Sequence, residues 1–158
     1  MTTSFMGELL TATHNFGTAP TRGTSTADTF KAALYLASAT INATTTVYTT
    51  TGEVTGNNYT AGGATTPAWN APTATTTAGS TTAGTAFTTP TASITYGTSG
   101  SPVTLSTAFD CVLIYNNTQS NKAVSVHTFG SQTVTSGVFT LTMPSNTTTT
   151  ALIRLATT

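Results

Sequence analysis

The sequence predicts an all-β protein, with an antiparallel β-sandwich or barrel-like domain, a short N-terminal helix or arm, and a long Thr/Ala/Gly-rich loop. Two observations support this prediction. Threonine supplies 46 of the 158 residues, and its branched, polar side chain suits the solvent face of a strand. Short apolar stretches also recur roughly every ten residues in the last third, between polar turns, as in antiparallel sheets. No strand pattern alternates with a long helix pattern, so a parallel α/β sheet is not expected.

The second unusual feature is the scarcity of charge. Four Lys or Arg and four Asp or Glu make up 5% of the chain and cancel to a net charge of zero, whereas about one quarter of an ordinary domain is charged. Uncharged strands with open edges are templates for further pairing, so such a chain must cover its edges or belong to an assembly that does. The composition therefore favours a building block over a free enzyme.

The first 28 residues are predicted to form an arm. Phe5 and Leu9 recur at helical spacing, which predicts a helix within residues 4–15 that Ser4 could cap. Gly17, Pro20 and Gly23 then interrupt regular structure. The arm is expected to dock on another subunit or protein.

Residues 29–158 are predicted to form the β-domain. Residues 64–102 are rich in Thr, Ala, Gly, Ser and Pro, which indicates a long loop within it, and residues 44–54 could add a short element. Gly130 and Ser131 are expected to turn the chain. The main predicted strands alternate apolar and polar residues or are strongly apolar, and they cover residues 29–37, 107–115, 123–129, 138–143 and 151–156.

Several classes of function lack their usual residues. The four basic residues are scattered, which argues against nucleic-acid binding. No apolar run approaches the roughly 20 residues that span a bilayer, and no basic leader precedes one, so neither membrane insertion nor secretion is expected. No glycine-rich phosphate-binding motif and no paired-histidine spacing is present, so no cofactor and no metal site is predicted.

Catalytic groups are also few. Asp110, Cys111 and His127 could be drawn as a catalytic set, but neighbours on a regular strand point to opposite faces, so the set would require a bulge. Cys111 is the only cysteine and lies in an apolar run, which predicts a buried thiol without a catalytic role. No catalytic residue is proposed, and the chain is not expected to be an enzyme.

Several segments together resemble a family of small structural proteins of tailed bacteriophages and prophages. The resemblance covers most of the chain except residues 17–28 and 64–102, and it implies a virion component without catalytic residues. The segments that carry it are Glu8–Phe16, Thr29–Tyr35, Thr45–Gly63, Leu113–Thr118, Asn121–Val126, Phe129–Gly130, Phe139–Pro144 and Ala151–Ala156.

The expected function is capsid decoration, in which the protein cements the head shell of the virion by binding the major capsid protein or other virion proteins. A homo-oligomer is expected, with a trimer favoured, assembled in the bacterial host cytoplasm. The alternative is a tail, neck or fibre component that binds another virion protein or a host surface glycan, with Trp69 and Tyr96 facing the glycan. Trp69 is more simply interpreted as packing its loop onto the domain. The candidate interface residues are Phe5, Leu9, Leu10, Phe16, Trp69 and Tyr96.

Overall fold

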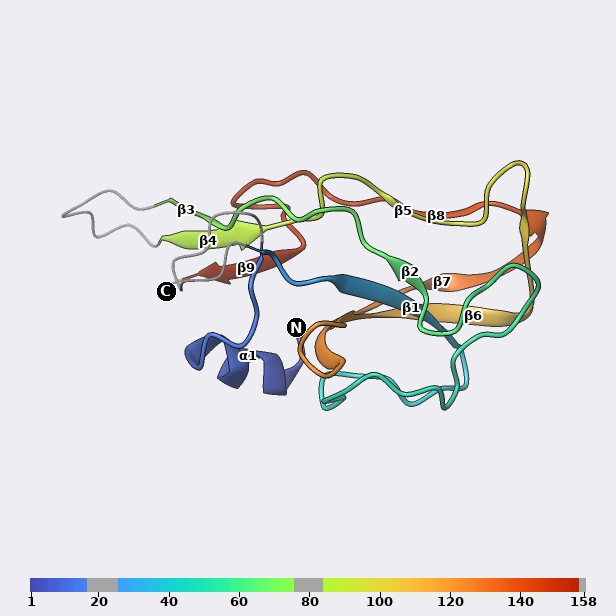
Figure 1. Ribbon diagram of the computed structural model, residues 1–158, viewed down its shortest axis with the longest axis horizontal. Helices are drawn as coiled ribbons and strands as arrows, with labels where there is room; N and C mark the ends of the chain where they lie inside the picture. The colour runs from blue at the N-terminus through green and yellow to red at the C-terminus, as the bar shows by residue number, and fades with distance from the viewer. Residues whose placement is uncertain (17–25, 76–83, 157–158) are drawn as a thin grey trace. The chain divides into compact units, whose positions relative to one another are not determined.

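The computed structural model describes residues 1–16, 26–75 and 84–156, and these form mostly antiparallel β-structure with one short helix (Figure 1). The helix and the strands are α1 (Thr3–Leu10), β1 (Phe30–Leu36), β2 (Ala64–Thr65), β3 (Thr73–Thr75), β4 (Thr85–Thr88), β5 (Ile94–Tyr96), β6 (Val103–Asn116), β7 (Lys122–Gly137), β8 (Phe139–Leu141) and β9 (Ile153–Ala156). The prediction of a β-rich chain with a short N-terminal helix is confirmed.

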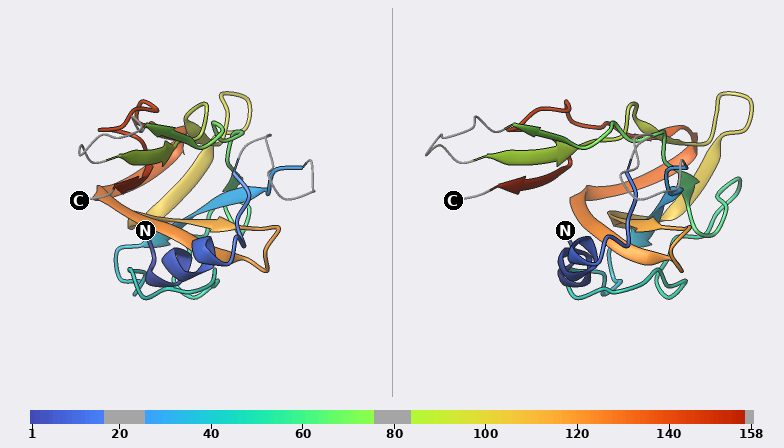
Figure 2. Two further views of the ribbon diagram at one scale, coloured as in Figure 1. Left: turned by 90° about the vertical axis from the view of Figure 1, so that its left-hand side faces the viewer. Right: turned by 60° about the vertical axis from the view of Figure 1, so that its left-hand side comes forward.

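The largest sheet has four antiparallel strands in the order β2-β1-β6-β7. Its central strands are β1 and β6, and the predicted hairpin of β6 and β7 forms one side of it, with pairs from Asn116 opposite Lys122 to Val103 opposite Gly137. The predicted turn at Gly130 and Ser131 is wrong, because β7 continues to Gly137 through an irregularity opposite residues 109–111. A glycine inside a strand commonly marks such a bulge. β7, in orange, is correspondingly bent in Figure 2.

The helix is shorter than predicted and begins earlier. Its N-cap is Thr2, not Ser4, because the Thr2 hydroxyl accepts a hydrogen bond from the Phe5 backbone N–H (3.4 Å). It ends at Leu10, and Ala12 then adopts a left-handed conformation (φ 51°) that cannot continue a helix. The Thr2 backbone N–H also donates to the Val124 carbonyl (3.0 Å), which holds the start of the helix against β7.

The segment interpreted as a long loop, residues 64–102, holds four short strands, β2 to β5. The loop prediction is therefore corrected in part. β4 pairs with β3 and with β9, and β5 pairs with β8, so two of the partners follow much later in the sequence. A strand with a remote partner gives no local hairpin signal, and the threonine-rich composition therefore indicated a loop. Residues 44–54, by contrast, contribute only isolated bridges at Val47 and Glu53.

The contacts of the chain divide it into two interleaved units. The first contains residues 1–14, 28–66 and 94–141, and the second contains residues 15–27, 67–93 and 142–158. In the first unit, a core cluster lies on β1, β6 and β7 and includes Tyr35, Leu113 and Tyr115. Cys111 belongs to this cluster, as predicted, and burial raises the pKa of its thiol to about 11, so the group stays protonated at neutral pH.

A second apolar layer of the first unit joins the two-stranded sheet of β5 and β8 to the four-stranded sheet. Phe139 on β8 makes an edge-to-face contact with Phe109 on β6, with ring centroids 5.0 Å apart. Tyr96 on β5 donates its hydroxyl to the Ala32 carbonyl on β1 (2.8 Å). These contacts hold the two sheets together through aromatic side chains.

Candidate functional site

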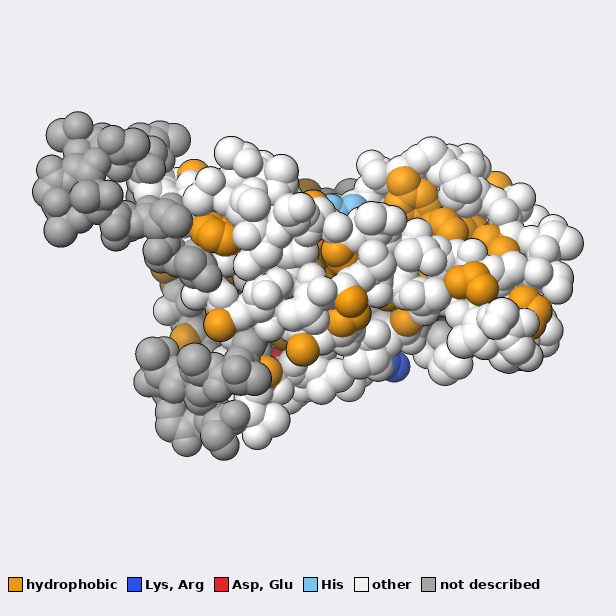
Figure 3. Space-filling model, turned by 90° about the horizontal axis from the view of Figure 1, so that it is seen from above, with side chains coloured by type: hydrophobic (Ala, Val, Ile, Leu, Met, Phe, Trp, Pro, Cys, Tyr) orange, Lys and Arg blue, Asp and Glu red, His pale blue; other side chains and the backbone are white. Residues whose placement is uncertain are grey.

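Most of the few charged side chains are engaged in contacts within the protein. Glu8, Asp28 and Lys122 meet around His14 and Asn116, and Glu53 is buried among tyrosines. Arg154 donates to the carbonyl of Thr149 (2.6 Å). The face seen in Figure 3 accordingly shows mainly uncharged polar and apolar side chains.

The first of these clusters, the arm clamp, contains Glu8, His14, Asp28, Asn116 and Lys122. Glu8 binds the Lys122 ammonium through Oε1 (2.6 Å) and the His14 Nε2 through Oε2 (2.8 Å). The Asn116 amide nitrogen faces both the His14 Nδ1 (3.0 Å) and the Asp28 carboxylate (2.7 Å). Because an amide nitrogen only donates, His14 accepts at Nδ1 and carries its proton on Nε2, toward Glu8.

The arm clamp joins three parts of the first unit that are remote in sequence. Glu8 is on α1, His14 follows the helix, and Asn116 and Lys122 flank the turn between β6 and β7. The His14 side chain is fully buried, so this histidine is not open to a substrate. The cluster therefore fixes the arm on the sheet, and its chemistry is that of a structural anchor.

Acid is expected to weaken the arm clamp through Glu8. Burial opposes the charged form, but hydrogen bonds from Lys122 and His14 outweigh it and hold the pKa of Glu8 below its usual 4.5. A depressed folded-state pKa stabilises the fold above the unfolded value, and this contribution is lost as the pH falls through the folded value. Urea unfolding from about pH 6 to about pH 3 should therefore show a steeper loss of stability for the wild type than for Glu8→Gln. Equal slopes would contradict this assignment.

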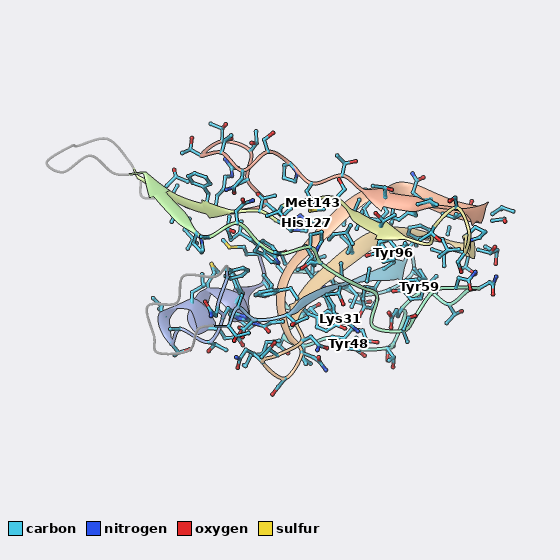
Figure 4. All side chains as sticks on the ribbon, turned by 45° about the horizontal axis from the view of Figure 1, so that its top comes forward. Lys31, Tyr48, Tyr59, Tyr96, His127 and Met143 are labelled. Atoms are coloured by element: carbon cyan, nitrogen blue, oxygen red, sulfur yellow. The ribbon has the colours of Figure 1, made fainter. Side chains whose placement is uncertain are left out.

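The second cluster surrounds Glu53 and contains all five tyrosines of the chain. The Glu53 carboxylate accepts hydrogen bonds from the Tyr48 hydroxyl (2.6 Å), the Tyr59 hydroxyl (2.8 Å) and the Gly62 backbone N–H (2.7 Å). Figure 4 labels Lys31, Tyr48, Tyr59 and Tyr96 on the ribbon. We name this set the Glu53 cluster, and its phenols are Tyr35, Tyr48, Tyr59, Tyr96 and Tyr115.

The Glu53 cluster orders residues 37–63, which contain no named strand. Tyr59 accepts a hydrogen bond from the Leu34 backbone N–H (3.0 Å) while it donates to Glu53. Tyr115 donates to the Gly62 carbonyl (2.8 Å) and stacks on Tyr48, with ring centroids 4.7 Å apart. The long connection is thereby tied to both β1 and β6.

The tyrosines are held in their neutral form. Burial, reinforced by the charge of Glu53, raises the pKa of Tyr115 to about 12 and raises the pKa of the other four phenols further. Neutral phenols can donate to the carboxylate but do not act as bases at neutral pH. Within the described ranges, no three His, Cys, Asp or Glu side chains gather where they could hold a metal ion.

A catalytic set of Asp110, Cys111 and His127 would require a bulge, and the β6–β7 register does shift between residues 109 and 111. The histidine is nevertheless engaged elsewhere: its Nε2 lies 3.0 Å from the Ser125 hydroxyl, and His127 is paired with Val112. Burial lowers the pKa of His127. The Cys111 thiol is buried and protonated, so the geometry offers no activated nucleophile at this place.

The candidate interface residues differ widely in exposure. Phe5, Phe16, Trp69 and Tyr96 are buried, and Leu9 is half-buried. Phe16 and Trp69 contact each other edge to face in the second unit, with ring centroids 4.9 Å apart. Trp69 therefore packs within its own chain, which was the simpler of its two interpretations, and neither Trp69 nor Tyr96 is placed to face a glycan. Leu10 is 90% exposed.

Three neighbours of Leu10 on the exposed face of α1 were not among the predicted interface residues. Thr3, Met6, Gly7 and Leu10 recur at spacings of three and four, and all four are exposed. We name these residues the helix stripe. Their helical spacing was visible in the sequence, but which side of the helix faces solvent depends on Phe5, which is fully buried on the opposite side.

No family model, no curated protein and no solved structure matches this chain. In the part of the chain that the structure describes, no helix is both long and apolar enough to cross a membrane.

Proposed function

We propose that this protein is a structural component of a tailed-bacteriophage virion, and specifically a capsid decoration protein that cements the head shell by docking on the major capsid protein through the helix stripe. The observation that carries the proposal is the exposure of Met6 and Leu10 on a helix that the arm clamp fixes in place. The resemblance of the sequence to small phage structural proteins supports the same assignment.

The energetics of the helix stripe suit a repeated docking contact. Leu10 is 90% exposed and Met6 is 50% exposed, in a chain that is 5% charged. Burial of such a side chain is worth about 1.5–3 kcal/mol. Because α1 is already ordered by Thr2, Phe5 and Glu8, little conformational entropy is lost when a partner covers it. A modest contact of this kind, multiplied over a capsid lattice, resists rupture.

The proposal includes the sandwich or barrel-like arrangement expected from the sequence. The contacts of Tyr96 with Ala32 and of Phe139 with Phe109, which bring the β5–β8 pair onto the four-stranded sheet, support it.

The location in the virion is tested by counting copies in purified particles. Quantitative mass spectrometry should find the chain in numbers comparable with the major capsid protein. A far smaller number would replace the decoration role by the alternative, a tail, neck or fibre component. Absence from particles would overturn the virion assignment itself.

The docking surface is tested by Leu10→Lys, which is expected to weaken binding to undecorated particles by about 10- to 100-fold, because it removes one apolar contact. A lysine is compatible with the C-terminal turn of a helix, so α1 should persist. The matched control is Thr60→Lys, which adds the same charge at an exposed loop residue. Binding is measured by co-sedimentation, and equal binding of the two variants would show that the helix stripe is not the docking surface.

A further inference from the structure

The strand β7 leaves one edge of the four-stranded sheet without a partner. It is the last strand in the order β2-β1-β6-β7, and it is also the longest, with 16 residues. An edge strand presents a row of backbone N–H and C=O groups that can pair with another strand. The opposite edge of the same sheet is β2, with two residues, and the strands of the other sheets in the described chain are only three or four residues long.

The protein covers only the beginning of this edge. The Thr2 N–H donates to the Val124 carbonyl (3.0 Å), the Ala123 N–H donates to the Thr46 carbonyl (3.0 Å), and Val47 forms a bridge with Lys122. Among the described residues, no segment pairs with the outer edge of β7 beyond Val124. The irregularity opposite residues 109–111 then separates the distal half of the strand from this covered start.

The distal half, Gln132–Ser136, is largely exposed. Gln132, Thr133, Thr135 and Ser136 are exposed, and Val134 is half-buried. β-Branched residues at positions 133–135 favour the extended conformation that pairing requires, whereas Ser136 has a positive φ (49°) and donates its N–H to the Thr104 hydroxyl (3.2 Å). Natural sheets protect such edges with lysine, proline, an inward charge or a β-bulge. After Lys122, β7 contains neither proline nor a Lys, Arg, Asp or Glu side chain, and its register with β6 shifts on either side of Val134.

We infer that two copies of this chain pair through the distal half of β7, antiparallel and about a two-fold axis beside Val134. Antiparallel pairing is self-complementary, because the same row of donors and acceptors meets itself after a two-fold rotation. The neutral side chains of Gln132–Ser136 also allow identical copies to meet without like-charge contacts, and the net charge of zero gives no longer-range repulsion. This assignment replaces the expected trimer with a dimer and does not depend on the proposed function.

The axis beside Val134 places Thr133 of one copy opposite Thr135 of the other. The double substitution Thr133→Lys and Thr135→Lys therefore sets lysine opposite lysine twice, which disfavours cross-strand pairing. The double substitution Thr133→Lys and Thr135→Glu instead sets opposite charges face to face at both positions. We expect the wild type and the Lys/Glu variant to be dimers and the Lys/Lys variant to be a monomer.

Sedimentation equilibrium over a wide range of protein concentration measures these masses, and circular dichroism checks that each variant is folded. Thr55→Lys with Thr60→Lys is the control, since it adds the same charge at exposed loop residues and should remain a dimer. In the wild type, hydrogen exchange at the amides of residues 132–136 should slow as the concentration rises, except at Ser136, whose N–H already donates to the Thr104 hydroxyl. This readout tests the pairing without any substitution.

Three outcomes would overturn the inference. A wild-type protein that stays monomeric at every concentration, or one with the mass of three chains, would exclude the two-fold pairing. Equal masses for the Lys/Lys and Lys/Glu variants would exclude the register about Val134. If Leu10→Lys abolished the dimer, and exchange at residues 132–136 of the wild type did not change with concentration, self-association would be assigned to the helix stripe.

Discussion

Replacement of Glu53 by alanine is expected to lower the free energy of unfolding by about 3–5 kcal/mol, the largest effect of any polar substitution in the first unit. The substitution removes the acceptor for Tyr48, Tyr59 and the Gly62 N–H together. Buried donors without acceptors each cost about 1–3 kcal/mol, and part of this cost is recovered where water reaches the half-buried Tyr48. Urea unfolding followed by tyrosine absorbance measures the loss.

Two milder variants make the Glu53 result specific. Glu53→Gln keeps an oxygen acceptor for Tyr59 and Gly62, and the Tyr48 hydroxyl can rotate to accept from the new amide, so the loss should be only about 1–2 kcal/mol. Tyr48→Phe removes one donor of three and should fall in the same range. If alanine were no worse than glutamine, the hydrogen bonds would not be what orders residues 37–63.

Gly63→Ala is expected to destabilise the protein by about 4 kcal/mol or more, enough to prevent folding of a marginally stable domain. A Cβ at this position would lie 1.8 Å from the Ala32 carbonyl oxygen and 2.6 Å from the Ala33 Cα, both in the backbone of β1. The residue also has φ +73°, which alanine adopts at a cost. A shift of the turn away from β1 would disturb the pairing of β1 with β2 and the hydrogen bonds of Gly62, and a shift of β1 would disturb its pairing with β6.

The matched control is Gly7→Ala, the same change in the middle of α1. A Cβ there meets no atom within 4 Å, and alanine is a better helix former than glycine by about 0.5–1 kcal/mol. Gly7→Ala should therefore raise the unfolding midpoint while Gly63→Ala lowers it or abolishes folding. Thermal unfolding by circular dichroism separates the two. A stable, folded Gly63→Ala protein would mean that the chain passes β1 at a greater distance than the structure places it.

Local patterns identified the elements whose partners are close in sequence. The apolar run before Asn116 and the alternation after Asn121 predicted the hairpin of β6 and β7, and Phe5 and Leu9 predicted the helix. The extension of β7 past Gly130 was not predicted. A glycine in the sequence indicates a turn, but here the strand continues past it because residues 132–137 also pair with β6. The strands within residues 64–102 were missed because β8 and β9, which pair with two of them, lie more than forty residues later.

The roles of particular polar residues depended on the tertiary structure. Threonine was interpreted as a solvent-facing residue, yet Thr88 and Thr89 are buried. The Thr88 hydroxyl donates a hydrogen bond to the Asn70 carbonyl, and the Thr89 hydroxyl accepts one from the Leu152 N–H. Glu53 was not singled out, because no spacing rule connects one carboxylate with tyrosines spread from position 35 to position 115. Phe5 and Leu10 were both predicted as interface residues, yet Phe5 is buried and Leu10 is exposed, since periodicity alone does not reveal which side of a helix is covered.

The interleaving of the two units has a consequence for biosynthesis. The chain passes between the units five times, from residues 1–14 in the first to residues 142–158 in the second. Neither unit is a continuous stretch that can emerge from the ribosome and fold before the other has been made. β4 can pair early with β3, but its other edge has to wait for β9, and β5 has to wait for β8. Large apolar side chains are few in these waiting strands, with Phe87 on β4 and Ile94 and Tyr96 on β5, so the nascent segments offer little for a chaperone or a neighbouring nascent chain to hold.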